Sequence, residues 1–208
     1  MKPKHLVMAG VTLAGLAVAA FAHSGATGVV KERMEAMKTM GEAVKRIKPM
    51  MTGETAYDAA AVREAARTIA AEAGEAMVEK FPQGSMEDPS EVRPRVWEEW
   101  DRFATLADRL ELAATGLERA AGNGLHGAGH MMGGQQGMMG GQQGMMGNQQ
   151  GMMGNQQGMM GGNMMMPGGD LPNGMTAEHI GQMPADGAFM MVTQVCSACH
   201  DRYRRDDG

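Results

Sequence analysis

Two cysteines and a histidine near the C-terminus of this 208-residue chain have the spacing of a prosthetic-group attachment site. Cys196 and Cys199 are separated by two residues, and His200 follows at once. On a helix, positions three and four apart share a face, so both thiols and the imidazole would point the same way. Two thiols at this spacing can add across the two vinyl groups of one porphyrin, and a histidine is the usual proximal iron ligand. The motif predicts one covalently attached haem c.

Three other chemistries use the same residue types. A zinc site needs two further clustered ligands, whereas the remaining histidines are scattered along the chain. A thioredoxin-like dithiol belongs to a βαβ context, which this sequence lacks. A structural disulfide is the ordinary state of two cysteines in an oxidising compartment. The histidine directly after Cys199 favours haem over all three.

The elements that must position this motif are predicted to be helices. Apolar residues recur every three or four positions in four segments: 27–51, 58–80, 93–121 and 184–205. Asp58 and Asp186 are the predicted N-caps of the second and fourth helices. The inward stripe of the third helix is predicted to be Val96, Trp100, Phe103, Ala107, Leu110, Ala114 and Leu117. Since no segment alternates as a strand would, the predicted fold class is all-α, an antiparallel four-helix bundle with a long disordered insert between helices three and four.

The first 22 residues have the features of a secretory signal peptide. A cationic start at Lys2 and Lys4 precedes an apolar run over 6–21, and Ala20 and Ala22 supply the small residues that a signal peptidase reads. The run is shorter than the roughly 20 residues needed to span a bilayer. We therefore expect cleavage after Ala22, a periplasmic location, and no membrane span in the mature protein.

The charge balance restricts the partners. The chain has 19 Lys and Arg against 24 Asp and Glu, a formal net charge of −5. Such a chain is not expected to bind nucleic acid or to attach to anionic lipid through a polybasic segment. The overall charge would suit docking to a basic redox protein of the periplasm.

Residues 122–183 are predicted to be a Met-, Gly- and Gln-rich insert of low complexity. Five Met pairs recur every seven residues from Met131 to Met160, and 122–169 contains no charged residue. A coiled coil is excluded, because one Met pair per two turns leaves no second seam and each Gly costs a helix about 1 kcal/mol relative to Ala. Thioethers suit Cu(I), and nitrogen ligands could come from His23, His126 and His130. Copper handling is therefore one interpretation, and a repeat expansion tolerated in a surface loop is the other.

The haem motif and its surroundings resemble the cytochrome c′ family, the class II cytochromes c. The motif continues into Asp201-Arg202-Tyr203-Arg204 on the last predicted helix. The other matching segments are Val30-Lys31-Glu32-Arg33 at the start of the first helix, Phe81-Pro82 with Gly84-Ser85 after the second, and Val96-Trp97 with Phe103 in the third. The resemblance covers nearly all of the chain between signal peptide and C-terminus outside the insert. It implies a haem protein that carries electrons and is not an enzyme, and whose bundles often pair as homodimers through their first helices.

The resemblance places the sixth iron ligand four residues after Arg33, at Met37. Family members with a methionine there resemble low-spin electron carriers, since a thioether ligand raises the reduction potential and fills the site. Members with a non-coordinating residue there bind nitric oxide or carbon monoxide, so a gas-binding protein is the alternative function. A methionine stripe at helical spacing is otherwise ordinary core, and Met34 or Met40 would be the ligand in another register.

Two arginines lie one helical turn from the predicted iron ligands. Arg33 precedes Met37 and Arg204 follows His200 by four residues. Each is predicted either to approach a haem propionate or to be an exposed charge at a helix end. The predicted organisation is a signal peptide over 1–22, helices one to three over 23–121, the insert over 122–183 and the haem-bearing helix over 184–208.

Overall fold

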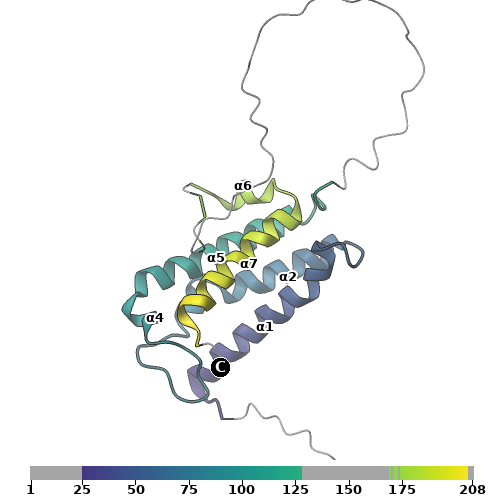
Figure 1. The fold of residues 1–208 in the computed structure, drawn as a ribbon. Helices are drawn as coiled ribbons and strands as arrows, with labels where there is room; N and C mark the ends of the chain where they lie inside the picture. Colours follow the sequence, from purple (N-terminus) through teal and green to yellow (C-terminus); the bar gives the residue numbers. More distant parts are fainter. Residues whose placement is uncertain (1–24, 128–168, 170, 173, 206–208) are drawn as a thin grey trace, which may run out of the picture.

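The computed structural model describes residues 25–127, 169, 171–172 and 174–205. The predicted signal peptide, His23, His130 and the five Met pairs lie outside these residues. Within them the helices are α1 (Gly28–Met51), α2 (Ala59–Glu72), α3 (Gly74–Val78), α4 (Arg95–Glu98), α5 (Trp100–Ala120), α6 (Ala177–Gly181) and α7 (Ala185–Tyr203). The described residues form no strand. The four longest helices form a four-helix bundle, which confirms the predicted all-α fold class (Figure 1).

The packing of the four long helices is uneven. α2 and α7 both pack along α5, and α1 packs along α2, but α1 and α7 have few contacts with one another. The core between the well-packed pairs is apolar; its fully buried side chains include Ile47, Ile69, Leu106, Leu117 and Val192. The long helices therefore leave room between α1 and α7. Among the described residues, no helix has the length and apolar character needed to cross a membrane.

α1 and the start of α2 form as the sequence predicts. Val30, Met40 and Ile47 of the predicted apolar stripe are buried in α1. Asp58 caps α2, because its carboxylate accepts hydrogen bonds from the backbone N–H groups of Ala60 at 2.8 Å and Ala61 at 3.2 Å. A side-chain N-cap of this kind typically stabilises a helix by about 1 kcal/mol.

The second predicted helix is in fact two helices. α2 ends at Glu72, and α3 begins at Gly74, whose φ of +57° lies in the left-handed region. Glycine adopts this region at no steric cost. A Cβ at Gly74 would also overlap the Glu111 carboxylate of α5. The prediction of one continuous helix over 58–80 is therefore wrong at the point where close packing on α5 requires a glycine.

The third predicted helix is also interrupted. Glu99 leaves helical geometry, with φ −124° and ψ 41°, and separates α4 from α5. Val96 and Phe103 of the predicted stripe are buried. Trp100 is 36% exposed, contrary to the prediction, because the break changes the phase of the stripe at the first residue of α5.

The structure describes a further helix, α6, before the predicted end of the insert at 183. α6 is a short helix whose N-cap Thr176 accepts a hydrogen bond from the His179 N–H at 3.3 Å, and its buried Ile180 packs against Gly116 of α5. α7 has Pro184 at its N-cap position and no side-chain cap, so the prediction that Asp186 caps this helix is wrong. The remainder of the insert, 128–168, lies outside the described residues.

Candidate haem site

A cavity of about 650 Å³ lies between α1 and α7. Its size is within the range of roughly 300–1,000 Å³ found for small-molecule and cofactor sites. The sequence-predicted site residues that line it are Arg33, Met37, Cys196, Cys199, His200 and Arg204. Residues from opposite ends of the described chain therefore line one cavity, and their roles toward a haem stay predictions.

Three aromatic rings form part of the cavity wall. The Phe81 and Phe103 rings have centroids 4.6 Å apart, and Tyr203 meets Phe103 edge-on at 5.6 Å. The Trp97 indole N–H donates to the Phe81 carbonyl at 3.0 Å, which ties α4 to the α3–α4 loop over residues 79–94. These rings give the cavity an apolar wall.

The two thiols are half-buried on α7 and are not joined in a disulfide. Burial raises the pKa of the Cys196 thiol to about 11 and that of Cys199 to about 12. Redox-active dithiols have lowered pKa values, because the thiolate is the reactive form. The structure therefore argues against the dithiol interpretation. The described residues also contain no group of three or more His, Cys, Asp or Glu side chains that could hold zinc.

His200 lines the cavity on the α7 side, together with the two cysteines. Burial lowers its pKa, and the Arg204 cation lowers it further, while Asp201 and Glu91 oppose the shift. The imidazole is therefore mainly neutral at pH 7, which is the form that can bind a metal. Two protonated thiols and a neutral imidazole, on one helix face beside an apolar cavity, fit the attachment of haem c.

The opposite wall of the cavity carries three thioethers. Met34, Met37 and Met40 of α1 all line it. Met37 is half-buried between the other two and occupies the position that the resemblance predicts for a sixth iron ligand. Met34 and Met40, the candidate ligands in the two other registers, line the same cavity as Met37. Substitution of each methionine must therefore decide which of the three binds iron.

Arg33 is built into the cavity wall and is 4% exposed. Its Nε and Nη2 donate to the Lys80 carbonyl at 3.0 and 2.9 Å. Nη1 donates to the Ser85 carbonyl at 3.2 Å and to Ser90 Oγ at 3.1 Å, and Nη2 also donates to Ser85 Oγ at 2.6 Å. The guanidinium lies over the Phe81 ring, 4.2 Å from its centroid.

The alternative that Arg33 is an exposed charge is wrong. Burial lowers its pKa, but a guanidinium stays protonated in proteins, and its five N–H groups are directed at the α3–α4 loop. A haem propionate would have to share these donors. The two serines that bind Arg33 were not predicted as site residues. The one signal for Ser85 was the likeness of the loop around it to the family's loop after the second helix.

Arg204 lies at the edge of the cavity, with 48% of its side chain exposed. Its Nε donates to Glu91 Oε2 at 2.6 Å. An approach of Arg204 to a propionate is compatible with this position and stays a prediction.

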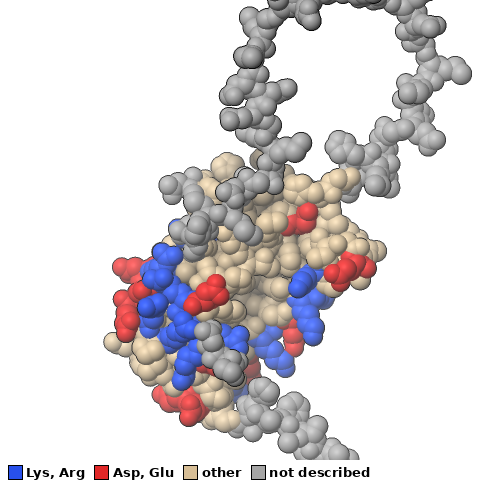
Figure 2. Space-filling model, in the orientation of Figure 1, with Lys and Arg blue, Asp and Glu red and all other residues tan. Residues whose placement is uncertain are grey.

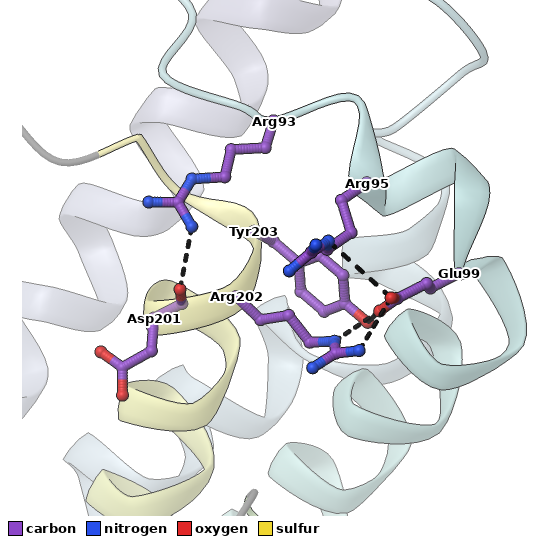
Figure 3. A network of polar contacts seen from close by, with 6 residues as sticks. All are labelled: Arg93, Arg95, Glu99, Asp201, Arg202 and Tyr203. Carbon is purple, nitrogen blue, oxygen red and sulfur yellow. Dashed lines mark hydrogen bonds and ion pairs between the residues drawn. The ribbon is translucent and has the colours of Figure 1, made fainter.

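The last turn of α7 is held to the α4–α5 junction by the Glu99 carboxylate (Figure 3). Arg202 donates to both carboxylate oxygens, at 2.7 Å through Nη2 and at a shorter distance through Nε. The Tyr203 hydroxyl donates to Glu99 Oε2 at 3.4 Å, and Arg95 Nε lies 3.8 Å from Oε1. These contacts fix the helical turn that follows His200.

A second set of contacts holds the same turn to the segment before α4. Arg93 Nη1 donates to the Asp201 carbonyl at 3.1 Å (Figure 3). The Arg93 N–H donates to the Tyr203 carbonyl at 2.8 Å, and the Arg205 N–H donates to the Glu91 carbonyl at 2.7 Å. Segments more than 100 residues apart in sequence thus close one end of the cavity.

We expect Glu99→Gln to lower the thermal midpoint of the holoprotein at pH 7. The midpoint of the variant should also fall less than that of the wild type when the pH is lowered. The hydrogen bonds from Arg202 hold the pKa of Glu99 below its usual range. A carboxyl with a depressed folded-state pKa stabilises the fold above its unfolded value of about 4.3, and this contribution is lost as the pH falls through the folded value. The difference in midpoint between wild type and Glu99→Gln should therefore shrink to nothing in acid. A constant difference across this pH range would contradict the prediction; the exposed Glu98→Gln is the matched control.

A four-helix bundle with a C-x-x-C-H face beside an apolar cavity defines the class of covalent haem proteins. The family model described as cytochrome C′ matches residues 28–141, and the chain belongs to the cytochrome c′ family. Its cofactor is therefore covalently bound haem c, and Cys196 and Cys199 have the spacing that attachment requires.

Two relatives support the family assignment. Cytochrome c-556 of Agrobacterium fabrum is 38% identical over 85 residues, which cover 41% of this chain and 57% of that protein. Cytochrome c′ of Rhodopseudomonas palustris is 33% identical over 105 residues, which cover 50% of this chain and 71% of that protein. The chain thus spans little more than half the length of the first of these relatives.

Solved structures of cytochrome c′ share the fold. The protein from Rhodopseudomonas palustris has a TM-score of 0.53 at 20% identity, with 88% of this chain and all of that chain covered. The protein from Thermochromatium tepidum has a TM-score of 0.52 at 20% identity, with 86% of this chain and 95% of that chain covered. At these identities the likeness extends to the fold alone.

Proposed function

We propose that this chain is an exported one-electron carrier in which His200 and Met37 hold the haem iron from opposite sides. The observation that carries the proposal is that Met37 of α1 lines the same cavity as Cys196, Cys199 and His200 of α7. When bound, the haem supplies an iron centre that cycles between its ferrous and ferric states. The reaction is this cycling, without turnover of a substrate.

Each side chain has a defined part in this proposal. Cys196 and Cys199 hold the cofactor through two thioether bonds. The neutral His200 imidazole offers a ring nitrogen from α7, and the Met37 thioether approaches from α1. A thioether opposite an imidazole raises the reduction potential, and a filled sixth position leaves small ligands to compete with a protein side chain.

The sequence and the surface support the proposed location and partners. The predicted signal peptide supports a periplasmic location, where redox proteins are the proposed partners and a homodimer is the proposed self-association. Figure 2 shows Lys and Arg side chains gathered over α4 and the end of α7, with Asp and Glu at the margin. The net charge of −5 therefore does not describe the surface beside the cavity. A redox protein that docks there meets several basic side chains.

Substituting Met37→Leu is the test of the proposal. Leucine has a similar volume but no sulfur, so we expect the ferric spectrum to change from low-spin to high-spin, with loss of the sulfur-to-iron band near the red edge. The ferrous variant should also bind carbon monoxide much faster than the wild type.

Met34→Leu and Met40→Leu are the matched controls, since both residues line the cavity on the same helix. Neither should change the spin state. A high-spin wild type that binds carbon monoxide at once would contradict His/Met ligation and support the gas-binding alternative. If the spin state changes in Met34→Leu or Met40→Leu and not in Met37→Leu, the iron ligand is the methionine one helical turn away from Met37.

A further inference from the structure

A histidine, a methionine and a carboxylate meet at the end of the bundle far from the cavity. His126 lies just beyond α5, while Met183 and Asp186 flank the start of α7. Asp186 and His200 are separated by fourteen positions on α7, roughly 21 Å along a helix axis. This cluster is therefore separate from the haem site.

The carboxylate of Asp186 fixes both the backbone and the ring of His126. Its Oδ1 accepts a hydrogen bond from the His126 N–H at 3.0 Å, and its Oδ2 lies 2.9 Å from the ring Nδ1. A neutral imidazole that donates its Nδ1–H to a carboxylate keeps an unprotonated Nε2. Histidines that bind metals commonly have this arrangement, because the carboxylate sets the tautomer and orients the ring.

The ends of the Met183 and His126 side chains both lie against Gly187 of α7. A Cβ placed on Gly187 would lie 3.4 Å from His126 Cε1 and 3.4 Å from Met183 Cε. The atoms next to these carbons are Nε2 in the ring and Sδ in the thioether. A methionine side chain has three rotatable bonds, so rotation of Met183 can turn its sulfur toward the imidazole edge beside Gly187.

The two backbone segments that carry the cluster are tied together. The Asn123 side-chain amide donates to the Gly181 carbonyl at 2.8 Å and to the Met183 carbonyl at 2.7 Å. The Ala185 N–H donates to the Gly124 carbonyl at 2.8 Å. The relative positions of the histidine and the methionine therefore depend on fixed backbone contacts rather than on two independent loops.

We propose that His126 Nε2 and Met183 Sδ form a binding site for Cu(I), with Asp186 as the residue that orients the imidazole. Thioethers select soft cations and imidazole suits copper. Zinc would need four ligands, and the described residues contain no group of three or more His, Cys, Asp or Glu side chains. The His126 side chain is 67% exposed, so a bound ion can exchange with solution.

The test is an anaerobic Cu(I) titration of the full-length holoprotein in competition with a chromophoric Cu(I) chelator. For one equivalent of copper we expect His126→Ala and Met183→Leu each to lower the affinity at least tenfold. Asp186→Asn should lower the affinity by about tenfold. This is the lower limit of the roughly 10- to 100-fold loss that is typical when the hydrogen-bond partner of a metal-binding histidine is removed. His179→Ala, which removes an exposed histidine of α6, should have no effect.

The imidazole signals of the ferrous, 15N-histidine-labelled protein distinguish this site from other methionines of the chain. One equivalent of Cu(I) should shift the His126 Nε2 resonance and leave His179 unchanged. Unchanged affinity in His126→Ala and Met183→Leu, or copper binding without a shift at His126, would overturn the proposal. Unaltered haem absorption and helical circular dichroism show that each variant retains the fold.

Discussion

Replacing Arg33 by methionine is expected to lower the free energy of unfolding by about 2–4 kcal/mol, because the buried acceptors that the guanidinium contacts lose their donor. Methionine keeps much of the apolar stem but none of the five donors. It leaves the carbonyls of Lys80 and Ser85 without the guanidinium that they contact. Each buried polar group left unsatisfied costs about 1–3 kcal/mol. Denaturant unfolding of the holoprotein, followed by circular dichroism, measures the change.

Two variants make this result specific. Arg33→Lys keeps the charge but not the planar fork, so we expect an intermediate loss. Lys31→Met, on the same helix with a side chain 60% exposed, should change the stability by less than about 0.5 kcal/mol, as is usual for surface substitutions. If Arg33→Met behaves like Lys31→Met, the guanidinium does not hold the α3–α4 loop against α1.

Gly116→Ala is expected to destabilise the protein despite the higher helix propensity of alanine. A Cβ at this α5 position would overlap Cβ and Cγ2 of the fully buried Ile180, so α6 would have to move. Overpacking of this kind typically costs about 1–3 kcal/mol and occasionally more, against a gain of at most about 1 kcal/mol from helix propensity. We expect a net loss of about 1–2 kcal/mol in denaturant unfolding.

The double variant identifies the cause. Ile180→Ala alone should cost about 2–4 kcal/mol, because it removes a buried side chain. In Gly116→Ala/Ile180→Ala the new methyl group occupies part of the space left by the isoleucine, so the combined loss should be smaller than the sum of the single losses. Additive losses would show that the contact between α5 and α6 is not the source.

The parts of the fold that local rules determine were predictable from the sequence. The spacing of apolar residues placed α1 within one residue of its observed start, and Asp58 is the N-cap that its position before an Ala-rich helix indicates. The C-x-x-C-H spacing identified the cofactor because its chemistry is contained in five consecutive residues. In each case the signal lies within a few residues of the structure that it predicts.

The parts that depend on tertiary packing were not predictable in this way. Gly74 lies in an Ala-rich stretch that favours a continuous helix, and neither its left-handed φ nor the approach of Glu111 from α5, which leaves no room for a Cβ, has a local sequence signal. The sequence around Arg33 suggests a charge on the helix surface, because the residues that bind its guanidinium lie 47 to 57 positions away along the chain. α6 has five residues, fewer than two turns, which is too short for a periodic pattern to appear.

The same distinction applies to the iron ligands. The motif assigns His200 by its own spacing, whereas Met37 depends on the register of α1 relative to α7. That register brings three methionines to one cavity. Sequence spacing cannot separate residues that share a helix face, and a spectroscopic comparison of the three variants can.

The hydrogen bonds that join Asn123 and Gly124 to Gly181, Met183 and Ala185 have a consequence for protein engineering. They join the segment after α5 directly to the segments before and at the start of α7, whereas Gly169, where the described chain resumes, packs against Leu106 of α5 and Ala198 of α7. The haem-bearing helix is therefore fastened to the end of α5 by contacts that do not run through residues 128–168. Doubling the length of a loop costs only about 0.6 kcal/mol of closure entropy, so a peptide inserted between 128 and 168 should leave the haem-bearing helix in its place.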